Sequence, residues 1–145
     1  MNKLSPEVHA IVDYITVLVL FISPIAFQFQ SFASFFTYLL ATVHLLITLS
    51  TDFPGGVFKI IPLKIHGLIE VLVSFALVGI SIWFKASGDT TASYFYLGFS
   101  VVLFAFWMVS DYKAATKKGP GGTLLTRTTV RSGSIEPPRR CATLR

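Results

Sequence analysis

Residues 8–27 read VHAIVDYITVLVLFISPIAF, an apolar run that is interrupted near its start by His9 and Asp13. About 20 apolar residues in a helix cross a hydrocarbon core of about 30 Å. The run is preceded by Ser-Pro-Glu (5–7). A serine N-cap, a proline in the first turn and an early acidic residue all favour the start of a helix. The stretch therefore predicts a transmembrane helix over residues 6–27.

The composition indicates that the rest of the chain is also built for a membrane. Of its 145 residues, 53% are hydrophobic and 13% are charged, whereas soluble domains carry about 25% charged residues. Mean hydropathy is +0.70. Three further apolar runs predict helices over residues 33–51, 63–84 and 92–112. We expect an all-α integral membrane protein with four transmembrane helices.

The chain contains an internal repeat. Residues 8–53 align with residues 65–112 when a two-residue insertion is allowed. The alignment matches three groups of polar residues: His9 with His66, Asp13 with Glu70, and STDF (50–53) with VSDY (109–112). Each copy holds two helices, so both copies insert in the same orientation, as parallel repeats about an axis along the membrane normal. The predicted fold is a bundle of two repeated helical hairpins.

A short motif recurs near the far end of the first helix of each hairpin. It reads Ser-Pro-Ile at residues 23–25 and Ser-Ile-Trp at residues 81–83. With one position replaced in each copy, it resembles the Ser-Pro-Trp motif of the SPW-repeat family of small bacterial integral membrane proteins. The resemblance covers residues 8–112 and implies this architecture and a bacterial inner membrane. It implies no activity and no catalytic residues.

The basic residues predict the orientation in the membrane. Of the 12 Lys and Arg residues, only Lys85 falls in the loop on the far side, and the other eleven lie on the side of the two termini. The positive-inside rule therefore places both termini in the cytoplasm. Residues 1–116 form the expected membrane domain, and residues 117–145, rich in Gly, Pro, Ser, Thr and basic residues, form an expected disordered cytoplasmic tail.

The same charge distribution bears on partners. The net charge is +5, but the positive charges lie beside the apolar runs, which is typical of contact with lipid headgroups and argues against nucleic acid. The expected partner is the lipid bilayer, with a membrane-protein partner or a second copy as a further possibility. The single Cys141 excludes a disulfide framework.

Helix direction and helical phase predict one polar site. Because residues three and four apart share a helix face, each span carries a single polar stripe, and polar groups in a bilayer should face one another inside the bundle. Five ionisable residues in the spans should converge in the cytoplasmic half: His9, Asp13, His44, His66 and Glu70. Asp52 and Asp111 should lie closer to its cytoplasmic mouth.

Three interpretations of this site stay open. The His–carboxylate pairs satisfy one another and hold the helices together, as in a structural or accessory protein, which the sequence favours. Alternatively, His9, His44, His66, Asp13 and Glu70 supply ligands for a transition metal, or His44 and a second histidine bind haem. Proton or small-ion transport is a third interpretation. No nucleophile elbow, phosphate-binding loop or cysteine cluster is present, which favours a non-enzymatic role.

Overall fold

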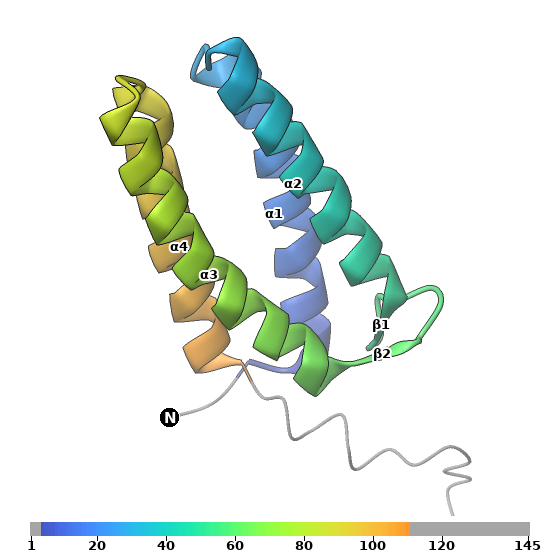
Figure 1. Ribbon diagram of the computed structural model, residues 1–145. Coiled ribbons are helices and arrows are strands. Elements are labelled where there is room, and N and C mark those ends of the chain that lie inside the picture. Colours follow the sequence, from blue (N-terminus) through green and yellow to red (C-terminus); the bar gives the residue numbers. More distant parts are fainter. Residues whose placement is uncertain (1–3, 111–145) are drawn as a thin grey trace, which may run out of the picture.

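The computed structural model describes residues 4–110, and these form four long helices and two short strands (Figure 1). The elements in chain order are α1 (Pro6–Ala26), α2 (Ser31–Ser50), β1 (Thr51–Asp52), β2 (Ile61–Pro62), α3 (Leu63–Ala86) and α4 (Thr90–Val109). The all-α fold with four helices is confirmed, and the largest difference from the expected bounds, three residues, is at the end of α4. The predicted tail (117–145) and Asp111 lie outside the described residues.

Local chemistry explains where the helices begin and end. The Ser5 hydroxyl accepts a hydrogen bond from the Val8 amide at the start of α1. The Asp89 carboxylate does the same for the Ala92 amide at the start of α4, at 3.0 Å. Both arrangements satisfy an amide that has no partner within its helix. Pro24 lies in the last turn of α1 and the helix ends two residues later, at Ala26, as expected because proline disrupts helix continuation.

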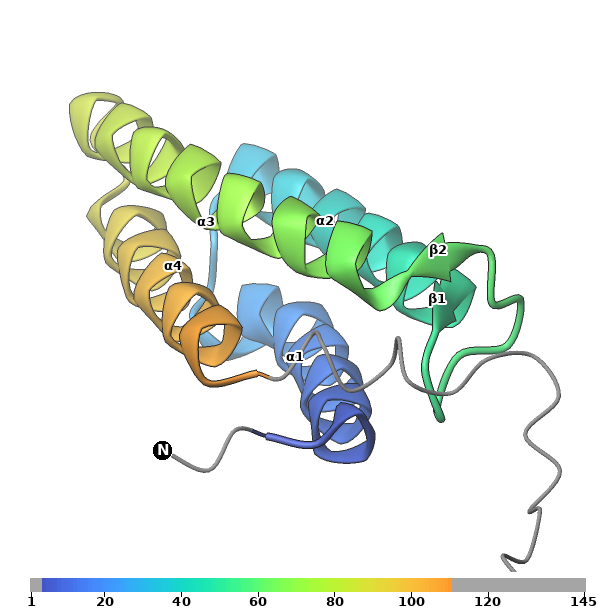
Figure 2. The same ribbon diagram turned by 90° about the horizontal axis from the view of Figure 1, so that it is seen from below.

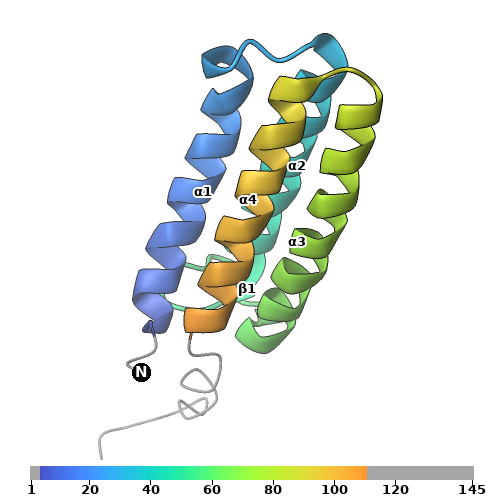
Figure 3. The same ribbon diagram turned by 90° about the vertical axis from the view of Figure 1, so that its left-hand side faces the viewer.

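The helices form two antiparallel hairpins. α1 packs mainly on α2, and α3 packs mainly on α4. α1 and α3 begin at one end of the bundle, where α2 and α4 finish and where β1 and β2 lie (Figure 3); we call this the strand end. The opposite end, which carries the connections 27–30 and 87–89, is the loop end. The two hairpins lean apart toward the loop end (Figure 1).

The outward faces of the helices are hydrophobic. On α1, Ile11, Ile15, Leu18 and Ile22 recur at helical spacing, and each is more than half exposed. All four helices are long and apolar enough to cross a membrane. The polar side chains of the spans instead lie largely inside, among them Ser74 and Ser100. A bundle that is apolar outside and polar inside is compatible with a small membrane protein.

Aromatic side chains fill the space between the hairpins toward the loop end. Phe29, Phe84 and Tyr96 belong to one buried cluster with Leu77 and Leu103. The rings of Phe84 and Tyr96 stack with centroids 5.2 Å apart. The rings of Phe32 on α2 and Trp83 on α3 also have centroids 5.2 Å apart. These contacts close the bundle where its backbones diverge.

Two short parallel pairings join the hairpins at the strand end. β1 pairs with β2 through Thr51 and Ile61, at the edge of the bundle in the view from below (Figure 2). Leu4 forms a second parallel bridge, with Ser110. Extending the repeat alignment pairs Leu4 with Ile61, and Ser110 already aligns with Thr51. The repeat therefore extends to backbone pairing, which the sequence analysis did not predict.

Candidate metal centre

Four buried side chains from α1 and α3 meet at the strand end. They are the repeat-related pairs His9 with Asp13 and His66 with Glu70. All four are at most 4% exposed. One nitrogen or oxygen from each lies within 4.8 Å of the other three. Each His and its carboxylate are four residues apart on one helix face, so duplication brings two such faces together.

The four side chains alternate histidine and carboxylate around their common centre. Four separations describe it: His9 Nε2 to Asp13 Oδ2 3.6 Å, His9 Nε2 to Glu70 Oε2 3.7 Å, His66 Nε2 to Asp13 Oδ2 3.3 Å, and His66 Nε2 to Glu70 Oε1 3.7 Å. Each imidazole faces one carboxylate on its own helix and one on the other. The two helices are therefore linked by reciprocal contacts.

The second nitrogen of each imidazole is held by a hydroxyl group. His9 Nδ1 lies 2.8 Å from the Ser110 hydroxyl, and His66 Nδ1 lies 2.8 Å from the Thr51 hydroxyl. Ser110 and Thr51 are repeat equivalents, and each contacts the histidine of the other hairpin. Both follow directly on the last residue of a helix, where the chain turns back across the strand end.

These hydroxyls determine which ring nitrogen carries a proton. The Ser110 hydroxyl donates its proton to the Phe106 carbonyl, and the Thr51 hydroxyl donates to the Ile47 carbonyl, each at 2.7 Å. A hydroxyl has a single proton, so both hydroxyls accept from the imidazoles. His9 and His66 therefore carry a proton on Nδ1 and direct Nε2 at the carboxylates.

This orientation requires either protons or a cation between the imidazoles and the carboxyl groups. In a neutral ring protonated on Nδ1, Nε2 presents a lone pair, which would face carboxylate oxygens that also carry lone pairs. Two arrangements remove the repulsion. Either protons lie between the imidazoles and the carboxyl groups, as imidazolium–carboxylate ion pairs or as neutral acid–imidazole pairs, or one divalent cation lies between two neutral imidazoles and two carboxylates. Both arrangements have zero net charge, as a buried site requires.

The separations fit the cation better than the ion pairs. Charge-assisted N–H···O bonds are about 2.7–2.9 Å long, shorter than the four separations here. His66 Nε2 and Asp13 Oδ2 have no hydrogen-bond partner among residues 4–110. Ligand atoms about 2.0–2.2 Å from a tetrahedral ion lie about 3.3–3.6 Å from one another. The four histidine–carboxylate separations of 3.3–3.7 Å approach that spacing, and the donor atoms of all four residues lie within 4.8 Å of one another.

The other predicted site residues lie outside this group of four. The His44 ring lies next to it, with its centroid 6.3 Å from that of His66. Asp52 is exposed and points away, because the backbone becomes extended at Thr51 and alternate side chains then face opposite sides. Thr51 and Phe53 face inward instead. Asp111 is outside the described residues.

Phe53 covers the group toward the strand end. It is 4% exposed and lies 6.4 Å from the His9 ring and 6.2 Å from the His66 ring, measured between centroids. The turn that carries it is tied to α1, because the Tyr14 hydroxyl donates a hydrogen bond to the Gly55 carbonyl at 2.8 Å. In the sequence, DFPGG (52–56) is a cluster of turn-forming residues, and no helical or strand period places Phe53 over the site. The one available signal was that Phe53, a large apolar residue, stands next to Asp52 at the predicted polar mouth.

Comparison with known proteins found no matching family model, no similar curated protein and no similar solved structure. The site therefore has to be interpreted from its own geometry.

Proposed function

We propose that this chain is a small integral membrane protein that binds one divalent transition metal ion through His9, Asp13, His66 and Glu70. Zn²⁺ suits this set best, because it accepts imidazole nitrogen and carboxylate oxygen in a tetrahedral arrangement. One observation carries the proposal: the four donor atoms lie within 4.8 Å of one another, from two repeat-related helices.

The surroundings of the histidines support the same function. Metal-binding imidazoles generally donate their second N–H to a nearby oxygen, which orients the ring. Ser110 and Thr51 supply that oxygen to His9 and His66. An ion at this position would also join α1 to α3, which pack mainly on other helices.

The alternatives from the sequence fit this geometry less well. The cavity that His44 shares with His66 has about 30 Å³ accessible to the centre of a water molecule, room for one or two waters, so we do not propose haem. Ion transport would need a polar path to the loop end, where the aromatic cluster of Phe29, Phe84 and Tyr96 lies. A metal-free structural cluster is the remaining alternative, and the experiment below distinguishes it.

The location of the site follows from the predicted orientation. The positive-inside rule puts the strand end, and with it the four ligands, in the cytoplasmic half of the membrane. A bacterial inner membrane and membership of the SPW-repeat family stay predictions, as does assembly with a second copy or another membrane protein.

Metal content tests the proposed function. Full-length protein purified in detergent is stripped with a chelator, loaded with Zn²⁺, desalted and analysed for bound metal. We expect one Zn²⁺ per chain, and none after Asp13→Asn, which keeps the side-chain shape and removes the charge. The control is Asp52→Asn, which changes an exposed carboxylate at the same end and should retain Zn²⁺.

Thermal unfolding gives a second measurement. An ion at one hundred times its Kd stabilises the folded state by about 2.7 kcal/mol, so Zn²⁺ should raise the unfolding temperature of the parent and leave that of Asp13→Asn unchanged. A parent protein that retains no metal and does not respond to added Zn²⁺ would refute the metal site and leave the structural cluster.

A further inference from the structure

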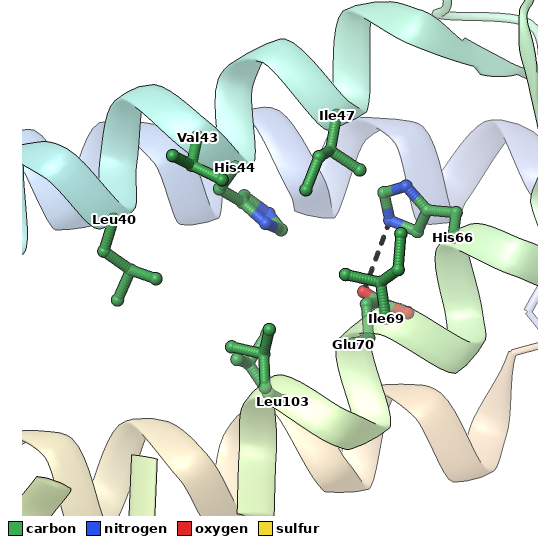
Figure 4. Close-up of a pocket in the computed structure, with 9 residues that line it drawn as sticks. Leu40, Val43, His44, Ile47, His66, Ile69, Glu70 and Leu103 are labelled. Atoms are coloured by element: carbon green, nitrogen blue, oxygen red, sulfur yellow. Dashed lines mark ion pairs between the residues drawn. The ribbon is translucent and has the colours of Figure 1, made fainter. Parts of the chain in front are cut away.

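A small cavity adjoins the four ligands on the side of α2. It lies between α2, α3 and α4, and His44, His66 and Glu70 form its polar walls. Leu40, Val73 and Leu103 form much of the rest. Two of the proposed ligands, His66 and Glu70, thus have one surface against the other ligands and another against this space (Figure 4).

His44, which lines this cavity, carries an unsatisfied polar atom. Its ring extends from α2 toward the same space as the ring of His66 (Figure 4). His44 Nε2 is buried, and the described residues supply no hydrogen-bond partner for it. A buried polar atom without a partner is costly, so a molecule in the cavity that bonds to His44 Nε2 would remove this penalty. The free volume is sufficient for one or two waters.

The repeat is broken at this position. His44 of the first hairpin aligns with Leu103 of the second, by the same alignment that pairs Thr51 with Ser110. Both residues line the cavity. Helix packing alone does not require a histidine here, because the equivalent position carries leucine. The four proposed ligands therefore follow the repeat, whereas the cavity wall does not, because it has a histidine in one hairpin and a leucine in the other.

We propose that the bound metal ion has a fifth, exchangeable ligand in this cavity, a water or a small anion that forms a hydrogen bond with His44. This inference rests on the proposed function, since it needs the ion. His44 is then a positioning residue for the exchangeable ligand, and the metal site is open to one small molecule. Structural zinc sites have four protein ligands and no such position, whereas catalytic zinc sites hold a water and can expand to five ligands.

Azide binding to the Co²⁺-loaded protein tests this inference. Co²⁺ accepts similar ligands and has visible absorption bands that change with the number and kind of its ligands. Full-length protein in detergent, loaded with one Co²⁺ per chain, is titrated with sodium azide. We expect a saturable change in the visible spectrum of the parent.

Two variants examine the two walls of the cavity. Leu103→Phe should fill the space, retain one Co²⁺ per chain and abolish the azide response. His44→Leu, which copies the residue of the second hairpin, should retain Co²⁺ and weaken azide binding about tenfold, through the loss of one hydrogen bond. Leu46→Phe adds the same bulk on an exposed face of α2 and should leave the azide response unchanged.

The outcomes separate the two proposals. If Co²⁺ binds but azide changes no spectrum, or has equal affinity for His44→Leu and the parent, the exchangeable position is refuted and the four-ligand site stands. If Leu103→Phe does not fold by circular dichroism, the comparison of His44→Leu with the parent decides alone. If the parent binds neither Co²⁺ nor Zn²⁺, the proposed function fails, and this inference fails with it.

Discussion

Thr37 on α2 and Tyr96 on α4 are repeat equivalents, and their hydroxyl groups lie 2.5 Å apart inside the bundle. The Thr37 hydroxyl donates to the Ala33 carbonyl at 2.7 Å. Since it has one proton, the Tyr96 hydroxyl donates to Thr37. Equivalent positions that touch must lie close to the axis that relates the repeats. A hydrogen bond thus joins the two hairpins at this axis toward the loop end. At the strand end, the group of His9, Asp13, His66 and Glu70 joins them.

Tyr96→Phe removes this contact and keeps the ring. We expect a loss of about 0.5–1.5 kcal/mol in the free energy of unfolding, because one buried hydrogen bond disappears while Thr37 keeps its bond to Ala33. Chemical denaturation in detergent measures it. Tyr94→Phe is the matched control, because Tyr94 is 64% exposed, and its effect should stay below about 0.5 kcal/mol. Equal effects of the two variants would contradict the assigned role of Tyr96.

The hydroxyls behind the histidines should tune metal affinity. Thr51→Val removes the oxygen that accepts from His66 Nδ1, and Ser110→Ala removes the one that accepts from His9. Each change should weaken Zn²⁺ binding about 10–100-fold, the usual effect of losing such an orienting partner. Competition with a chromogenic chelator measures the Kd. Thr42→Val is the control, since the Thr42 hydroxyl donates to the Tyr38 carbonyl on an exposed face, away from the ligands, and the Kd of this variant should match that of the parent.

The turn after β1 should tolerate no side chain at Gly56. A Cβ there would overlap the Thr51 carbonyl oxygen, so Gly56→Ala must displace the residue that holds His66. We expect a loss of about 1–3 kcal/mol in unfolding free energy, the range for overpacking, together with weaker Zn²⁺ binding. Gly79→Ala provides the contrast. A Cβ at this position in α3 meets no atom within 4 Å, and alanine should stabilise the helix by about 0.5–1 kcal/mol. A neutral Gly56→Ala would contradict the described turn.

The orientation can be tested in intact cells. In a Cys141→Ser background, single cysteines at Ser87 and Lys59 report on the loop end and the strand end. A membrane-impermeant maleimide should label Ser87→Cys directly and label Lys59→Cys only after the cells are opened, because the positive-inside rule places the strand end in the cytoplasm. Labelling of Lys59→Cys alone in intact cells would reverse the topology.

Much of the site could be predicted because the relevant side chains lie within regular helices. The spacing of His9 and Asp13, and of His66 and Glu70, places each pair on one helix face, and the repeat places the two faces at the same depth. His44 was expected among the ligands on the same grounds. Its helical phase is right in that it faces the interior. The structure nevertheless places it beside the group, because its position along α2 is a turn or more removed from Thr51, which contacts His66.

The remainder depends on backbone that has left the helix. Asp52 was expected closer to the cytoplasmic mouth than the ligands, and the structure places it exposed at the strand end, because the chain is extended from Thr51 onward and its side chains alternate. The same change brings Thr51 to His66 and Phe53 over both imidazoles. The roles of Thr51 and Phe53 could be predicted only if the pairing of β1 with β2 were known. A two-residue pairing between distant segments leaves no periodic pattern in the sequence.

The position of Phe53 has a kinetic consequence. Its ring lies across both imidazoles and is almost fully buried, so an ion among the four ligands has no open route toward the strand end while the 53–56 turn stays in place. Exchange of such an ion through that end would then be no faster than the detachment of the turn from Tyr14. Tight binding and slow release through the strand end would then be separate properties of the molecule, the first determined by the four ligands and the second by the turn that carries Phe53.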